Sequence, residues 1–100
     1  PLTTDFVISR LLKSAPKKNE TLHHFLSTMY QFDGEVTAGN IDELVARLQK
    51  ENEWSRRALS IGVCILFGGP AHDRVIRQQA DDKALHWNTL VYQLSMSSPF

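Results

Sequence analysis

Cys64, His72 and Asp73 have the residue types of a nucleophilic site, in which an imidazole activates a thiol and a carboxylate orients the imidazole. The sequence places Cys64 inside an apolar segment, near the expected C-terminal end of a helix, where the helix dipole disfavours a thiolate. We therefore expect an inert thiol and a protein that is not an enzyme. A cysteine-dependent hydrolase or transferase is the alternative, and a thiol-reactivity probe of the native protein tests it.

The histidines give little indication of a metal site. His23 and His24 are adjacent, so on a helix they point about 100° apart and cannot chelate one ion as an i, i+4 pair could. The sequence has no HExxH motif and only one cysteine, which also excludes an internal disulfide framework. We expect no metal and no cofactor.

The glycine pair in "FGGPAHDR" lacks the features of a phosphate-binding loop, because no Lys-Ser/Thr pair and no third glycine accompany it. One interpretation is a corner in which Gly68, in the left-handed conformation, ends one helix and Pro70 starts the next. The other concerns Gly69, which removes a second side chain from an exposed tip and would let another protein approach the backbone. The residues alone leave both interpretations open.

The composition indicates a folded domain without a strongly charged surface. Apolar residues make up 42% and aromatic residues 9% of the 100 residues, which suffices for a hydrophobic core. Eleven basic residues balance eleven acidic ones, so the electrostatic signature of nucleic-acid binding is missing. The longest apolar run, 58–67, is too short to span a bilayer. We expect residues 1–100 to form a single domain that is a fragment of a longer chain.

Helical periodicity dominates the chain. Thr3 or Thr4 can cap a first helix that ends at Ala15-Pro16, and Asn19 can cap a second one that Asp33-Gly34 ends. Asn40 caps a third helix, and after Pro70 a long amphipathic segment runs to Leu94, with a bend or break in "QADDKA". The apolar stripes of the first three helices are Phe6, Val7, Leu11 and Leu12; Leu22, Phe25, Leu26, Met29 and Phe32; and Ile41, Leu44, Val45 and Leu48.

The segment from Trp54 to Phe67 is apolar around most of its circumference, which is typical of a helix buried on most sides. The run "IGVCILF" also has the β-branched residues of a strand, but its polar entry "ENEWSRRALS" favours a helix. The sequence thus predicts an all-α fold, a compact bundle of four or five helices that is monomeric and folds without a ligand. We expect six core residues, namely Trp54, Ile61, Ile65, Leu66, Leu90 and Leu94.

With its flanking segments "GNIDELVARLQKENEWSRRALS" and "ADDKALHWNTLVYQLSM", the glycine loop resembles a known family. The chain is similar to a kinase-interacting domain of the AvrPtoB (HopAB) type III effectors of plant-pathogenic Pseudomonas. It is most like the domain that binds a BAK-type receptor-like co-receptor kinase. The "GINP" stretch of the sister Pto-binding domain is absent.

This resemblance implies a small helical bundle that inhibits a kinase in the manner of a pseudo-substrate. It would be secreted by the type III system into the host plant cell and act at the cytoplasmic face of the plasma membrane. There it would occupy the substrate-recognition region of the kinase and suppress host immunity, without catalytic residues of its own. The expected partner contacts are Phe67, Gly68, Gly69, Pro70 and His72. The alternative is a helical scaffold or oligomerisation domain without a kinase target, which size-exclusion behaviour distinguishes.

Overall fold

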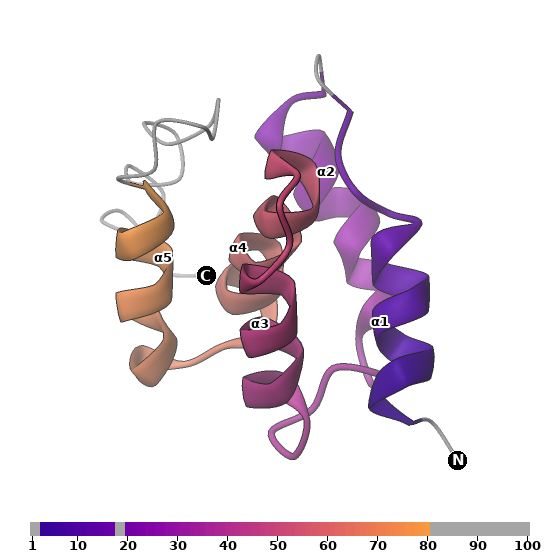
Figure 1. The fold of residues 1–100 in the computed structure, drawn as a ribbon, viewed down its shortest axis with the longest axis vertical. Coiled ribbons are helices and arrows are strands. Elements are labelled where there is room, and N and C mark those ends of the chain that lie inside the picture. The colour runs from indigo at the N-terminus through magenta and orange to yellow at the C-terminus, as the bar shows by residue number, and fades with distance from the viewer. Residues whose placement is uncertain (1–2, 18–19, 81–100) are drawn as a thin grey trace.

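The computed structural model describes residues 3–17 and 20–80. Within these ranges the protein is all-α, and Figure 1 shows its helices gathered into one bundle. The elements are α1 (Thr4–Leu12), α2 (Leu22–Met29), η1 (Tyr30–Phe32), α3 (Ile41–Gln49), α4 (Trp54–Phe67), η2 (Pro70–His72) and α5 (Asp73–Ala80), where η marks a 3-10 helix. The predicted bundle of four or five helices is confirmed.

Helix α4 is the centre of the bundle. It packs against α1, α2, α3 and α5, and its residues 58–65 form an unbroken buried stretch. Because residues 61–67 belong to this α-helix, the strand alternative for "IGVCILF" is wrong. Gly62 lets α4 approach α2, since a Cβ atom at this position would lie 2.8 Å from the Phe25 ring. In the described ranges, no helix has the length and apolar character needed to cross a membrane.

The core predictions for α4 are confirmed in part. Ile61 and Ile65 are buried, and Leu66 is partly buried against the core. The side chain of Trp54, and the predicted core residues Leu90 and Leu94, lie outside the described part of the chain, as does the predicted break near residue 82.

Helix α1 begins as predicted but ends earlier. The hydroxyl of Thr3 accepts a hydrogen bond from the backbone N–H of Phe6 at 3.2 Å, which satisfies one free donor of the first turn. The α-helix ends at Leu12 rather than at Ala15, because the backbone N–H groups of Ser14 and Ala15 donate to the carbonyls of Leu11 and Leu12, three residues back, and not four. The buried face also differs, since Phe6 remains 50% exposed and Ile8 is buried instead.

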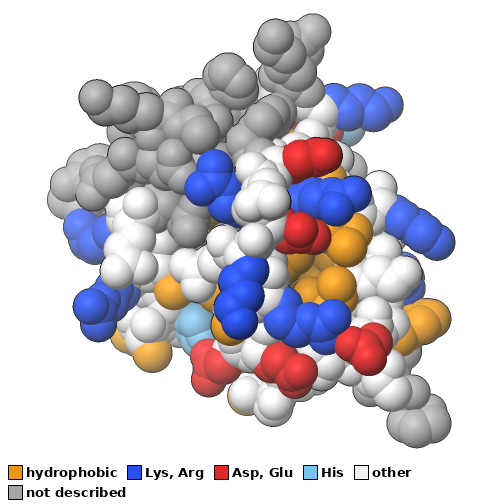
Figure 2. Space-filling view, viewed as in Figure 1, with side chains coloured by type: hydrophobic (Ala, Val, Ile, Leu, Met, Phe, Trp, Pro, Cys, Tyr) orange, Lys and Arg blue, Asp and Glu red, His pale blue; other side chains and the backbone are white. Residues whose placement is uncertain are grey.

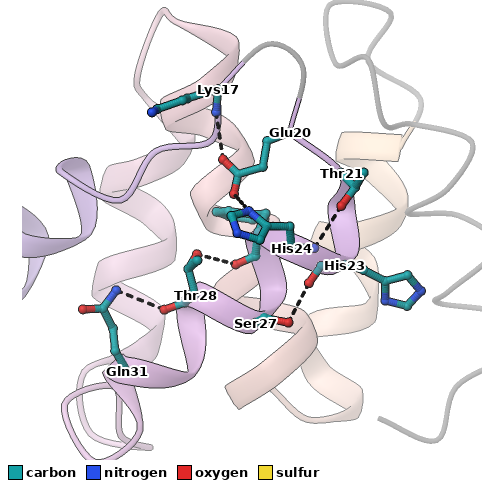
Figure 3. Close-up of polar contacts among 9 residues, drawn as sticks. Lys17, Glu20, Thr21, His23, His24, Ser27, Thr28 and Gln31 are labelled. Atoms are coloured by element: carbon teal, nitrogen blue, oxygen red, sulfur yellow. Dashed lines mark hydrogen bonds and ion pairs between the residues drawn. The ribbon is translucent and has the colours of Figure 1, made fainter.

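Helix α2 is capped by Thr21, so the prediction that Asn19 caps it is wrong. The Thr21 hydroxyl accepts from the backbone N–H of His24 at 3.1 Å. Glu20 lies before the helix, and its Oε1 accepts from the backbone N–H of Lys17, as Figure 3 shows. The helical segment ends at Phe32, directly before Asp33-Gly34, as predicted, and Gly34 has a φ of +87°, in the left-handed region that favours glycine.

Asn40 occupies the N-cap position of α3, but its side chain does not bond to the helix. Its Oδ1 accepts from the Thr37 backbone N–H and its Nδ2 donates to the Glu35 carbonyl, both at 2.8 Å. The amide therefore stabilises the preceding loop, a local use of Asn that competes with capping. Asp42 and Glu43 lie in the first turn of α3, where negative charge is favourable to the helix dipole.

Candidate functional site

The glycine turn begins where α4 ends. The backbone N–H of Gly68 donates to the Cys64 carbonyl at 3.1 Å, which closes the last turn of the helix. The prediction of a left-handed Gly68 is wrong, because its φ of −84° and ψ of 174° are extended. A side chain is excluded by crowding instead: a Cβ atom would lie 2.5 Å from the Cys64 carbonyl oxygen and 2.9 Å from the Cβ of His72.

Gly69 has the opposite environment. It is exposed, its backbone is extended, and a Cβ atom built on it would meet nothing within 4 Å. Neither steric crowding nor backbone conformation in this structure therefore requires a glycine at position 69. Its two polar backbone groups are nevertheless occupied: the N–H donates to Nδ1 of His72 at 3.1 Å, and the carbonyl accepts from the His72 N–H at 2.9 Å.

Pro70 is exposed and starts η2, as predicted, and its carbonyl accepts from the backbone N–H of Asp73 at the start of α5. Proline suits this position because its fixed φ fits the first helical turn and it brings no unsatisfied N–H. The turn between α4 and α5 is therefore short and internally hydrogen-bonded.

The five predicted contact residues thus lie in one turn, but they differ in accessibility. Gly69 and Pro70 form the exposed tip, Phe67 is partly buried against the core, and Gly68 is partly covered. The His72 side chain is only 15% exposed and lies in the base of the turn.

Sequence reasoning missed a sixth residue of this region, Asp42. Its Oδ1 lies 3.0 Å from Nε2 of His72, which connects the N-terminal end of α3 to the turn. The two residues are 30 positions apart, and no sequence pattern indicates which acidic residue of the chain would face His72.

Cys64 lacks the properties of a nucleophile. Its side chain is 2% exposed, and burial raises the pKa of the thiol to about 12, with a smaller contribution from the negative charge of Asp42. Both ring nitrogens of His72 bond to other partners, Gly69 and Asp42. The geometry therefore favours the interpretation of Cys64 as a small core residue.

The histidines of α2 are engaged in local contacts at the surface. His24 Nδ1 lies 2.9 Å from Oε2 of Glu20, and His23 uses its backbone carbonyl to accept from the Ser27 hydroxyl (Figure 3). Across residues 3–17 and 20–80, no three side chains of His, Cys, Asp or Glu come together in a group that could hold a metal ion.

The surface over α3 mixes both signs of charge. Figure 2 shows Lys and Arg side chains interspersed with Asp and Glu on this face, with apolar side chains between them. Arg47 pairs with Asp5 at 2.6 Å, and Thr4 donates to Glu43 at 3.1 Å, so part of this charge ties α1 to α3. Such a face carries no extended field of a single sign that would attract a nucleic acid.

A surface hollow of about 410 Å³ lies between α1 and η1, away from the glycine turn. Exposed Phe6 contributes to it together with polar and basic side chains; its lining residues are Phe6, Ser9, Arg10, Lys13, Ser14 and Gln31. Arg10, one of its two basic lining residues, already pairs with Glu35 and lies 5.2 Å above the Phe32 ring. This hollow is therefore a weaker candidate than the turn.

Comparison with known proteins gives no relative for this chain. No family model matches it, and neither does any curated protein or solved structure. The functional assignment accordingly depends on the residues and geometry of the site and on the resemblance noted from the sequence.

Proposed function

We propose that this chain is a non-catalytic docking domain of a bacterial effector, of the AvrPtoB (HopAB) kinase-interacting type. In this proposal the turn between α4 and α5 binds the cytoplasmic domain of a BAK-type plant receptor-like kinase. The bound domain covers the substrate-recognition region of the kinase and prevents phosphorylation of downstream proteins. It acts after type III secretion into the plant cell, at the cytoplasmic face of the plasma membrane.

The observation that carries the proposal is the environment of Gly69. A side chain would fit at this position, and the backbone dihedral angles are accessible to any residue, so internal packing gives no reason for a glycine. A glycine at an exposed tip next to Pro70 is accounted for by close approach of another molecule to the backbone.

The turn is also suited to binding at low entropic cost. Both backbone polar groups of Gly69 are paired within the turn, and Pro70 has no N–H to satisfy. A partner therefore approaches a tip that is largely ordered before binding, which limits the conformational entropy lost on association. Van der Waals contact of the tip, with Phe67 at its side, supplies the affinity, and no step of bond chemistry is required.

The experiment is a binding and inhibition assay with the purified domain and the cytoplasmic domain of a BAK-type receptor-like kinase. We expect a one-to-one complex by size-exclusion chromatography and reduced phosphorylation of a protein substrate. Raising the substrate concentration should relieve the inhibition, because substrate and domain compete for one region. A free domain that elutes as a stable oligomer and leaves the kinase active would favour the scaffold alternative and contradict the proposal.

A further inference from the structure

The imidazole of His72 connects three elements of the fold. Its Nδ1 lies 3.1 Å from the backbone nitrogen of Gly69, and its Nε2 lies 3.0 Å from Oδ1 of Asp42. His72 itself is the last residue of η2, Gly69 follows the end of α4, and Asp42 is in the first turn of α3. The ring is largely covered, whereas Asp42 is 89% exposed.

The two hydrogen-bond partners indicate which ring nitrogen carries the hydrogen. A backbone N–H can only donate, so Nδ1 must accept the hydrogen bond from Gly69 and carries no hydrogen. A carboxylate can only accept, so Nε2 carries the hydrogen and donates it to Asp42. The geometry is therefore that of the Nε2–H tautomer, with both ring nitrogens satisfied.

This arrangement resembles a capping box. In a capping box the side chain of the third helical residue reaches back to the backbone N–H of the N-cap residue, which removes one unsatisfied donor. Here His72 reaches back to Gly69 in that way, and the bond to Asp42 in turn orients the ring. Two adjacent glycines have more backbone freedom than any other pair, so a bond that fixes Gly69 has a large effect on the turn.

We propose that His72 is a positioning residue that holds the Gly69-Pro70 tip in a single conformation, with Asp42 fixing the ring that does so. The partner contacts the tip, and His72 acts through the tip rather than by touching the partner. That a partner contacts the tip rests on the proposed function. That His72 holds the tip in one conformation concerns the free domain and is independent of the proposed function. Loss of the imidazole returns at least one backbone residue to disorder, which should weaken partner binding about tenfold.

The free domain provides the first test. In nitrogen NMR spectra of the His72 ring, we expect an unprotonated Nδ1 and a protonated Nε2, and we expect slow hydrogen exchange at the Gly69 amide. His72→Ala should make the Gly69 amide exchange rapidly. His72→Gln should restore the protection, because glutamine at this position can accept from the same N–H. His24→Ala is the matched control, since it removes a histidine that also contacts a carboxylate but lies in α2.

Kinase affinity of the same variants provides the second test. We expect about tenfold weaker binding for His72→Ala, near-normal binding for His72→Gln and no change for His24→Ala. Equal loss of affinity in the alanine and glutamine variants, with Gly69 protected in the latter, would mean that the imidazole itself touches the partner, which overturns the positioning role.

The two tests separate the two proposals. An Nδ1-protonated ring in the wild-type domain, or unchanged Gly69 exchange in His72→Ala, overturns the role of His72 whatever the kinase does. A wild-type domain that shows the expected NMR signature but binds no receptor-like kinase contradicts the proposed function and leaves the positioning of the tip supported.

Discussion

The middle of α4 and the turn at its end both depend on glycine, but for opposite reasons. Gly62 is buried, and a Cβ atom there would lie 2.8 Å from the Phe25 ring and 3.4 Å from the terminal methyl of Met29. Gly69 is exposed and a Cβ atom there would meet nothing. The first glycine serves the packing of the bundle, whereas the second leaves backbone accessible at the surface. Stability and partner binding should therefore respond to different substitutions.

The largest effect is expected in the interior of α4. Ile61→Ala should lower the free energy of unfolding by about 2–5 kcal/mol, because it removes apolar contacts and leaves a cavity in the core. Chemical denaturation measures the change. Tyr30→Ala, at an exposed aromatic residue, is the control and should cost less than about 0.5 kcal/mol. Similar values for the two variants would show that α4 is not the centre of the core.

Gly62→Ala tests the close approach of α4 to α2. The added methyl group overpacks the site against Phe25, at a cost of about 1–3 kcal/mol, while better helix propensity returns about 1 kcal/mol. We expect a net destabilisation of up to about 2 kcal/mol. In a double-mutant cycle, Phe25→Leu should relieve part of it, because the smaller side chain makes room. Additive losses would contradict direct contact between the two positions.

The pH dependence of stability tests the burial of Cys64. Its pKa is about 12 in the folded protein against an ordinary value of 9.0, so above pH 9 the unfolded chain releases the thiol proton and the folded protein retains it. The contribution of the protonated thiol to the free energy of unfolding is complete below pH 9 and is lost as the pH rises towards 12. About 1 kcal/mol of this contribution is lost by pH 10. Denaturation of wild type and Cys64→Ala at pH 8 and pH 10 should show a steeper loss in wild type. An equal loss of stability between pH 8 and pH 10 in the two proteins would mean that the thiol is accessible.

The adjacent glycines of the turn should differ in how much an alanine substitution changes the stability of the domain. Gly68→Ala should destabilise the domain by about 1 kcal/mol, because its Cβ atom would lie too close to the Cys64 carbonyl. Gly69→Ala should change the stability by less than about 0.5 kcal/mol. The difference in melting temperature between the two variants measures this contrast, and a reversed order would contradict the described geometry of the turn.

Local signals in the sequence were sufficient for much of this fold. The apolar circumference of residues 54–67 predicted the central helix, Asp33-Gly34 predicted the end of the helical segment that η1 closes, and Pro70 predicted the start of η2. Each of these features depends on residues that are close in the sequence, so propensity and periodicity report them.

The features that the sequence did not predict depend on tertiary packing. At position 68, His72 and the end of α4 leave no room for a side chain, whereas the backbone conformation is not left-handed. Only the three-dimensional arrangement shows this crowding. The contact of His72 with Asp42 joins residues 30 positions apart. Asn40 occupies the cap position but bonds to the loop, because its side chain has a competing local partner there.

The central claim is that partner binding, and not the stability of the fold, requires a glycine at position 69. Gly69→Gln and Gly39→Gln place the same neutral side chain at two exposed glycines, each with room for a Cβ atom. Melting temperature and affinity for the cytoplasmic domain of a BAK-type receptor-like kinase, measured together on both variants, test the claim directly. We predict that both variants melt close to wild type and that only Gly69→Gln loses kinase binding. A folded Gly69→Gln domain that binds the kinase as tightly as wild type would contradict the account.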